Sequence, residues 1–264
     1  MTVFDADRPM RVAVLFSGGA SGIRYLRAHD PNYGEEYTVV VGFTDDPTCP
    51  GVDALQDADI PVEHVDIRAF YEERDAEIGD LTVRSAFDAC TADILAEYSP
   101  DIVMLSGYMW ILTAPVLDRF PTINVHPADL TIVDENGDRV YVGADPVFDA
   151  IAAGEPATRS SVHFVTSEVD AGPLLVRSEP FDVHRELVTT LAEFDADEAL
   201  QQYVDAHQEW MKWAGDGPAL AAALELLAAG RVERTGTTVR IDGDPAVYDL
   251  DAGIRSPPTN TPVQ

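Results

Sequence analysis

Short apolar runs alternate with amphipathic stretches through the first half of the chain. Five runs have the length and composition of buried strands, at residues 11–16, 37–43, 61–65, 101–105 and 121–125. Between the third and fourth runs, apolar residues follow helical spacing from Val83 to Tyr98, and Ser99-Pro100 ends that helix. Strands and helices that alternate at this rhythm are typical of α/β proteins. The pattern therefore predicts a mostly parallel twisted sheet with helices on both faces.

The second half of the chain is organised differently. A polar loop is expected at 128–145 and a helix at 146–153, followed by paired strands at 160–166 and 174–181 around the turn at 170–173. Residues 187–229 are rich in helix, with a break at 215–218, and a small hairpin is expected over 231–241.

These elements predict a single α/β domain at residues 10–243, with a helical C-terminal elaboration. An N-terminal extension at 1–9 precedes it, and a largely irregular C-terminal tail at 244–264 follows it.

The charge balance of the chain is extreme. Its 264 residues include 47 acidic and 17 basic ones, for a net charge of −30, and Lys212 is the only lysine. A dispersed acidic, lysine-poor surface is typical of a halophilic cytoplasm, where salt screens the repulsion that would otherwise loosen the fold. The same balance excludes sequence-independent nucleic-acid binding, which needs clustered Lys and Arg.

Other features place the protein in a cell compartment. No apolar run is long enough to cross a membrane, and the N-terminus lacks the basic start and apolar stretch of a signal peptide. Cys49 and Cys90 are interpreted as free thiols in a reducing compartment. We therefore expect a cytoplasmic protein, a monomer or a homodimer, with small molecules as partners.

The first candidate for chemistry is the glycine-rich turn at residues 17–22, directly after the first strand. Ligands of open parallel sheets bind beyond the carboxyl ends of the strands. Glycines let the backbone approach an anion, and the amides of the following helix face it. The turn has neither the G-x-G-x-x-G spacing of a dinucleotide site nor the lysine of a P-loop, so a structural turn is an equally good interpretation.

A second candidate is the pair Asn124 and His126 at the end of the fifth strand. Residues two apart on a strand project to the same side. An amide donor and an imidazole side by side suit a developing oxyanion, because one donates a hydrogen bond and the other moves a proton near neutral pH. The other histidines, including His163, are interpreted as ordinary buried or surface side chains.

Asp170, in the turn after a later strand, is the third candidate. A carboxylate beside an imidazole favours the protonated ring, although a turn alone also accounts for an Asp here. No metal site is predicted, because the histidines are scattered and no C-x-x-C or H-x-x-x-H pair is present. A serine hydrolase is disfavoured by the absence of a G-x-S-x-G elbow.

The motifs together resemble those of the 10-formyltetrahydrofolate-dependent formyltransferases. The matching segments keep the family's order over roughly residues 10–243, and the most specific are the Asn-x-His-Pro and Asp-x-Gly-Pro pair. The segments are 14–21, 84–88, 99–112, 123–127, 161–165, 169–173 and 227–231.

The resemblance implies a role for each matched residue. Asn124 and His126 would hold and protonate the tetrahedral intermediate, and Asp170 would keep His126 protonated. The implied phosphate-binding residues are Gly18, Gly19, Ala20 and Ser21. The implied folate-binding residues are Arg84, Met109, Trp110, Ile111 and Leu112. The implied co-substrate is 10-formyltetrahydrofolate, and the default acceptor is phosphoribosylglycinamide of purine biosynthesis.

The chain departs from the family pattern at substrate-facing positions. Ala20 replaces a glycine and Gly22 an asparagine in the phosphate turn, and Trp110 replaces an arginine in the folate loop. The Ser-Leu-Leu-Pro that usually follows the histidine is replaced by Ala128-Asp-Leu-Thr131 and a longer polar loop. The resemblance therefore implies the reaction class more firmly than the acceptor.

Three alternatives remain open. The acceptor could be another amine such as an amino sugar, or water, with release of formate. The chain could be a folate- or nucleotide-binding module without catalysis. A nicotinamide oxidoreductase, with Asp45 or Asp46 on the ribose, has only the glycine turn in its favour.

Overall fold

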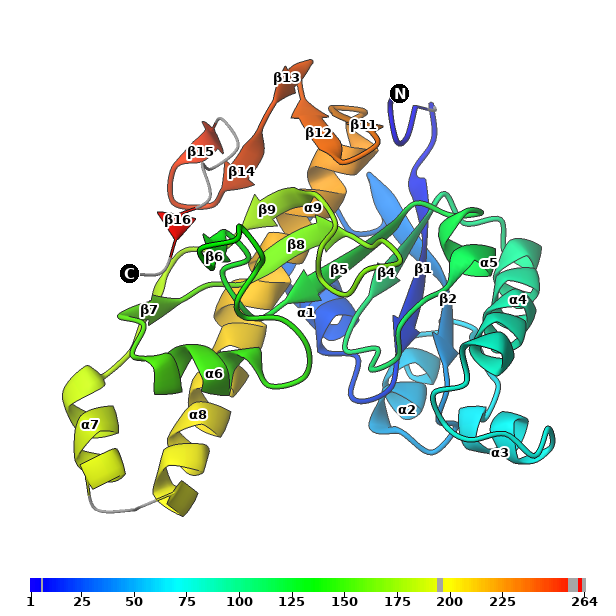
Figure 1. Ribbon diagram of the computed structural model, residues 1–264. Helices are drawn as coiled ribbons and strands as arrows, with labels where there is room; N and C mark the ends of the chain where they lie inside the picture. The colour runs from blue at the N-terminus through cyan, green and yellow to red at the C-terminus, as the bar shows by residue number, and fades with distance from the viewer. Residues whose placement is uncertain (6, 194–196, 256–260, 263–264) are drawn as a thin grey trace.

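The central sheet is the frame of the molecule. The computed structural model describes residues 1–5, 7–193, 197–255 and 261–262. In this part of the chain, nine strands form one sheet in the order β15-β14-β9-β8-β5-β4-β1-β2-β3 (Figure 1). The first five strands of the chain are parallel, which confirms the predicted sheet: β1 (Met10–Phe16), β2 (Tyr37–Thr44), β3 (Val62–His64), β4 (Ile102–Leu105) and β5 (Thr122–His126).

Helices cover both faces of the sheet, as predicted. One face packs against α1 (Ser21–His29), α2 (Pro50–Gln56) and α9 (Gly217–Ala228), which contribute buried residues such as Ile23, Leu55 and Leu224. The other face packs against α3 (Ile67–Glu72), α4 (Leu81–Glu97) and α5 (Ala114–Leu117), with Phe87 and Leu95 at the centre. These two apolar layers account for strands that are buried on both sides.

The antiparallel part of the sheet begins at β5. There β8 (Ser161–Phe164) pairs antiparallel with β5, and β9 (Leu174–Arg177) pairs antiparallel with β8. Short strands flank this region: β6 (Ile132–Val133), β7 (Ala157–Thr158) and β10 (Phe181–Asp182). The paired strands on either side of the Asp170 turn are therefore β8 and β9.

The helical elaboration projects beside this part of the sheet. It contains α6 (Pro146–Ala153) and the hairpin of α7 (Arg185–Glu193) and α8 (Asp197–Met211), which Figure 1 shows protruding at the lower left. A π-helical segment, Lys212–Asp216, joins α8 to α9, where the sequence predicted a break. The helix continues because a π-helical turn, in which the Gly217 amide donates to the Lys212 carbonyl, accommodates Pro218.

The C-terminal tail differs from the predicted irregular segment. The hairpin expected over 231–241 is present as β11 (Val232–Thr235) and β12 (Thr238–Ile241), and β13 (Asp244–Pro245), the first strand of the tail, extends it into a small sheet. The main sheet then gains β14 (Val247–Asp249), parallel to β9, and β15 (Gly253–Arg255), while β16 (Thr261–Pro262) pairs with β6. These strands are too short for a visible alternation of apolar residues. Residues 256–260 and 263–264 of the tail lie outside the described residues.

The N-terminal residues 1–5, expected as an extension, run beside β11. Val3 donates its backbone amide to the carbonyl of Val232 at 2.9 Å, and the Phe4 ring is buried in the core. Among the described residues, no helix has the length and apolar content needed to cross a lipid bilayer.

Candidate functional site

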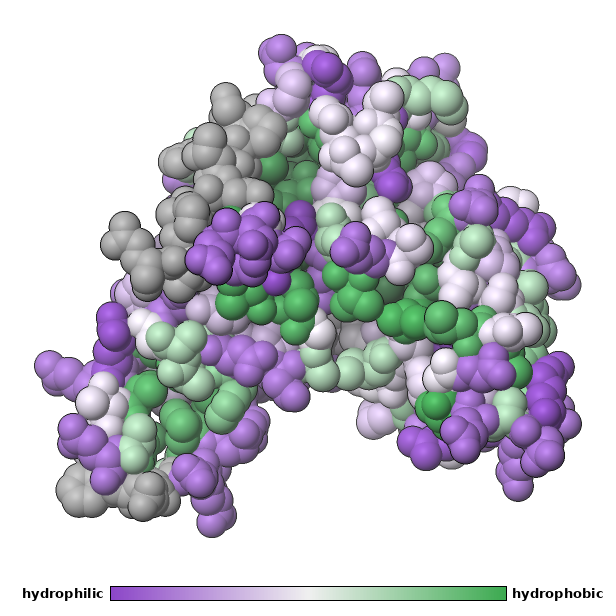
Figure 2. Space-filling model, viewed as in Figure 1, coloured by the Kyte–Doolittle hydropathy of each residue, from purple (hydrophilic) through white to green (hydrophobic). Residues whose placement is uncertain are grey.

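A cavity of about 430 Å³ opens at the carboxyl ends of β1, β4 and β5. Its walls come from the start of α1, the loop 105–112, the end of β5, the loop 165–170 and the α8 to π-helical region. Figure 2 shows hydrophobic side chains gathered along the recess between the α7–α8 hairpin and the part of the molecule that carries α3. The cavity is therefore at the place where open α/β sheets bind ligands.

The register between β5 and β8 builds the polar end of the cavity. Asn124 lies opposite His163, and Asn124 and His126 project to the same side of β5. The Asn124 amide nitrogen is 3.4 Å from His163 Nε2, and all three residues line the cavity. His126 and His163 are only 4% and 1% exposed, so both rings are held by their surroundings.

Asp170 reaches this end of the cavity from the loop between β8 and β9. One carboxylate oxygen is 3.5 Å from His126 Nδ1, and the other is 3.5 Å from His163 Nε2. The backbone amide of Gly143 donates to the same carboxylate at 2.9 Å. Burial alone raises the pKa of Asp170, but the contact with His163 and the charge of His126 bring that pKa below its usual value.

Both ring nitrogens of His126 face acceptors. Nδ1 faces Asp170, and Nε2 lies 2.9 Å from the carbonyl oxygen of Tyr141. Burial lowers the pKa of His126, and the nearby carboxylate and carbonyl only partly offset that effect. The Asp170 carboxylate acts in the direction that the sequence predicted, toward the protonated ring, but burial outweighs its effect on the pKa of His126.

His163 is the site residue that the sequence analysis passed over. Its Nδ1 lies 3.0 Å from the carbonyl oxygen of Phe164, which leaves Nε2 for Asn124 and Asp170. A lone histidine on a strand carries no signal by itself. The antiparallel pairing of β8 with β5 is what brings His163 beside Asn124.

The predicted phosphate turn joins β1 to α1. Ser21 and Gly22 line the cavity, whereas Gly18, Gly19 and Ala20 lie outside its lining. Ala20 has a φ of 49°, in the left-handed region that favours glycine, and its methyl group is buried. The Gly22 amide donates to Ser106 Oγ at 3.0 Å, and a Cβ at Gly22 would lie 2.7 Å from that oxygen. The asparagine that the family carries at this position would not fit here.

The predicted folate loop lines the opposite part of the cavity. Met109 and Ile111 are 67% and 45% exposed beside it, and Leu112 is buried. Trp110 donates from Nε1 to Asp45 at 2.7 Å, and Ser17 donates to the same carboxylate at 2.5 Å. Asp45 is thus engaged in fixing this loop, which removes it as the ribose ligand of a nicotinamide cofactor.

Arg84 does not line the cavity, contrary to the expectation from the resemblance. Its side chain is buried behind the folate loop, where it pairs with Asp88 at 2.7 Å and donates to the hydroxyl of Tyr108 at 2.9 Å. The pairing partner stands one helical turn further along α4, so the guanidinium turns into the core. Among the described residues, nothing accepts a hydrogen bond from Nε or Nη1 of Arg84.

The α8 to π-helical region provides the remaining polar groups. Gln208, Lys212 and Asp216 line the cavity, and Lys212 is the one Lys or Arg among the described lining residues. Its ammonium pairs with Glu209 at 2.8 Å. Burial raises the pKa of Asp216 to about 6, and Ser160 donates to its carboxylate at 2.5 Å. No group of His, Cys, Asp and Glu in the described part of the chain is arranged to hold a metal ion.

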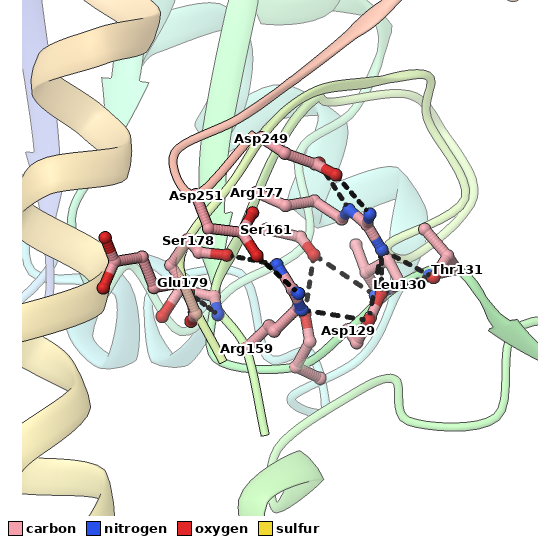
Figure 3. Close-up of polar contacts among 12 residues, drawn as sticks. Asp129, Leu130, Thr131, Arg159, Ser161, Arg177, Ser178, Glu179, Asp249 and Asp251 are labelled. Atoms are coloured by element: carbon pink, nitrogen blue, oxygen red, sulfur yellow. Dashed lines mark hydrogen bonds and ion pairs between the residues drawn. The ribbon is translucent and has the colours of Figure 1, made fainter. Parts of the chain in front are cut away.

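The segment after His126 is tied to the C-terminal strands (Figure 3). Arg177 on β9 donates to Asp249 at 2.7 and 2.8 Å, and its third nitrogen donates to Thr131 at 3.0 Å and to Asp129 at 3.2 Å. Arg159 adds an ion pair with Asp251 at 3.2 Å. The tail that carries β14 therefore helps to fix the start of the loop beside the catalytic candidates.

Comparisons with known proteins show which family the chain resembles. The family profile described as Formyl transferase matches residues 10–206. A phosphoribosylglycinamide formyltransferase of Mycobacterium tuberculosis is 32% identical over 171 residues, covering 64% of this chain and 70% of that protein. The trifunctional purine biosynthetic protein adenosine-3 of Bos taurus is 29% identical over 186 residues, which are 69% of this chain but only 16% of that protein.

A solved structure extends the similarity to the fold. Glycinamide ribonucleotide transformylase 1 from Symbiobacterium toebii aligns with a TM-score of 0.67 and 26% identity, over 89% of this chain and 95% of that one. Since the family profile matches most of the length of this chain, the chain belongs to the formyl transferase family.

Proposed function

We propose that this protein transfers a formyl group from 10-formyltetrahydrofolate to the amine of phosphoribosylglycinamide, a step of purine biosynthesis. One observation carries the proposal: Asn124, His126 and Asp170 meet at one end of a cavity, with His163 beside them. The family membership and the names of the relatives support the same reaction class.

In this reaction the amine nitrogen bonds to the formyl carbon, and the carbonyl oxygen takes up negative charge. The bond from that carbon to N10 of the folate then breaks, and N10 takes up the proton that the amine has lost. The Asn124 amide donates to the oxyanion, and His126 supplies the second donor and moves the proton. The oxyanion favours the imidazolium form of His126, which the Asp170 carboxylate then stabilises.

The folate loop suits the donor. Met109 and Ile111 expose apolar surface beside the polar end of the cavity, and Trp110 adds an aromatic body without charge. Such surface suits the face of a flat pterin ring. Arg84 supports the loop from behind through Tyr108 rather than through contact with the donor.

The opposite side of the cavity suits a phosphorylated acceptor. Ser21 begins α1 and lines the cavity, so the first turn of the helix, whose amides have no partner within the helix, lies beside a bound acceptor. The Gly22 amide is already used by Ser106 Oγ at 3.0 Å. Lys212 lines the cavity together with Ser21 and Gly22 and supplies a positive charge. A phosphate bound between them leaves the amine of the acceptor pointing toward His126.

The test of the reaction class is the formylation rate of the acceptor with 10-formyltetrahydrofolate in concentrated KCl. We expect His126→Gln to lower kcat by about 100- to 10,000-fold, because proton transfer is lost. His184→Gln, on the exposed surface at the start of α7, is the matched control and retains the wild-type rate. Equal rates in the wild type and His126→Gln would contradict the proposal.

Phosphate recognition is tested separately. We expect Lys212→Met to raise KM for phosphoribosylglycinamide by at least about tenfold, which corresponds to the loss of one charge-assisted contact. The KM for 10-formyltetrahydrofolate should stay the same. If the acceptor without its phosphate shows the same rise in KM, Lys212 does not bind the phosphate.

A different amine acceptor, such as an amino sugar, is the second candidate. The observation in its favour is the segment 128–143, which departs from the family and reaches His126 through the Tyr141 carbonyl. Formylation of such an amine at a higher kcat/KM than phosphoribosylglycinamide would assign it as the substrate.

We further infer that the protein works in a salt-rich cytoplasm, as a monomer or a homodimer. The net charge of −30 and the single lysine support salt adaptation.

A further inference from the structure

The segment from Arg139 to Gly143, which we call the brace, touches both acid–base candidates. Arg139 donates to the backbone carbonyls of Asp170 and, at 2.9 Å, of Gly172. The Tyr141 carbonyl lies 2.9 Å from His126 Nε2, and the Gly143 amide donates to the Asp170 carboxylate at 2.9 Å. Three residues of one segment therefore hold the catalytic pair from the side opposite to β5 and β8.

A local hairpin presents Arg139 to the Asp170 loop. Val133 and Arg139 form a backbone bridge, and the Asp134 side chain accepts from the amides of Asn136 and Asp138 in the turn between them. These contacts fix the hairpin, and the fixed backbone keeps the guanidinium of Arg139 at the Asp170 loop. Burial lowers the pKa of Arg139, and only the charge of Asp170 offsets that effect.

The loop that Arg139 grips needs such support. Asp170 has a φ of 50°, a conformation that costs a residue with a side chain free energy unless its surroundings impose it. The carboxylate stands 3.5 Å from both His126 and His163, longer than a tight charge-assisted hydrogen bond. Small movements of the loop therefore decide whether either contact shortens during the reaction.

We propose that Arg139 is a positioning residue: its fork on the carbonyls of Asp170 and Gly172 sets the place of the Asp170 carboxylate against His126. The inference rests on the proposed function, because it assigns the consequence of that placement to formyl transfer.

Two readouts test the proposal, and only one of them depends on turnover. Hydrogen exchange of residues 166–173 in the ligand-free protein reports the grip of the brace on the loop. Steady-state kinetics in concentrated KCl reports its consequence. The variants are Arg139→Gln, which removes the charge, and Arg139→Lys, which keeps the charge but offers no planar fork. Arg119→Gln, which removes an exposed arginine paired with Asp93 at 2.8 Å, is the matched control.

In Arg139→Gln we expect faster exchange confined to 166–173 and a kcat lowered by about 10- to 100-fold, with KM for both substrates within about twofold. Arg139→Lys should fall between this variant and the wild type, and Arg119→Gln should match the wild type. The thermal unfolding midpoint, measured alongside, separates a local effect from general destabilisation.

The pH titration of His126 distinguishes a positioning role of Arg139 from a merely structural one, because only the positioning role shifts the pKa of His126 in a stated direction. The charged and titratable groups that face His126 are Asp170, His163 and Arg139. In Arg139→Lys the cation remains, so displacement of Asp170 lowers the pKa of His126 and moves its titration, followed by NMR, to lower pH.

Unchanged exchange at 166–173 together with an unchanged His126 titration would overturn the proposal, whatever the turnover. If the wild-type protein shows no formyl transfer, while Arg139→Gln still exchanges faster at 166–173, the proposed function is overturned and the positioning role of Arg139 stands.

Discussion

At the scale of single residues, Gly172 decides where Asp170 can stand. A Cβ at this position would lie 1.7 Å from the carbonyl oxygen of Phe164, so the loop after β8 closes only with glycine there. The Gly172 carbonyl also accepts from Arg139. The glycine of the Asp-x-Gly-Pro motif is thus a steric requirement of this loop.

We expect Gly172→Ala to lower the free energy of unfolding by about 3 kcal/mol, because the backbone of β8 has to move away. Gly19→Ala is the matched control, since nothing lies within 4 Å of a Cβ there. Chemical denaturation of both variants checks the difference, and equal stabilities would contradict the close approach seen at Gly172.

The residue scale also shows where sequence patterns reach their limit. Asn124, His126 and Asp170 could be selected because each stands at the end of a predicted strand or just after one, and the structure brings all three together. His163 was interpreted as an ordinary side chain, although it lies in the family-matching segment 161–165, because its place beside Asn124 comes from the pairing of β8 with β5. Arg84 was expected at the cavity, but its partner Asp88 draws it into the core, and no local pattern reports that choice.

At the scale of elements, the π-helical segment brings a titrating carboxyl to the cavity. Asp216 stands at its end, where Ser160 donates to it and burial raises its pKa to about 6. The sequence showed Gly and Pro around this point and therefore predicted a break. It could not show that the helix continues with one widened turn, because that outcome depends on packing of Gly215 against Ser160 and Phe181.

This carboxyl predicts a pH-dependent stability. The folded-state pKa of Asp216 lies above the unfolded value of 3.8, so the folded state loses stability as pH rises from about 4 to about 6. Asp216→Asn removes this loss, because an amide stays neutral and still accepts from Ser160. We expect the variant to unfold at a higher temperature than the wild type above pH 6 and at a similar one near pH 4.

Thermal unfolding between pH 4 and pH 8 checks this expectation, with Asp205→Asn on the exposed face of α8 as the matched control. A constant difference between Asp216→Asn and the wild type over the whole range would show that the carboxyl does not titrate in this window.

At the scale of the whole molecule, the sheet order was largely foreseeable and the ends of the chain were not. The parallel half was predicted from five apolar runs, at residues 11–16, 37–43, 61–65, 101–105 and 121–125. The C-terminal strand β14 was not predicted because its three residues, Val247–Asp249, are too few to show an apolar pattern. It joins the sheet by parallel pairing with β9, and Asp249 pairs with Arg177. Arg177 also donates to Asp129, so the tail supports the loop after His126 as well as the sheet.

The net charge of −30 predicts a strong dependence of stability on salt. Screening lengths fall from about 10 Å at 0.1 M salt to about 3 Å at 1 M, which removes most repulsion between surface carboxylates. We expect the thermal unfolding midpoint to rise steeply between these KCl concentrations. Sorbitol, as an uncharged control, should raise it far less, and a midpoint that ignores KCl would remove the salt-adaptation inference.

The measurement that tests the central claim most directly is the fate of the formyl carbon. The wild-type protein in concentrated KCl is given isotopically labelled 10-formyltetrahydrofolate and phosphoribosylglycinamide, and the products are identified by mass spectrometry. For the wild type we predict label in the formamide of the acceptor and none in formate. For His126→Gln we predict no labelled formamide and no labelled formate. Label in formate alone, or no loss of label from the folate, would contradict formyl transfer to this amine.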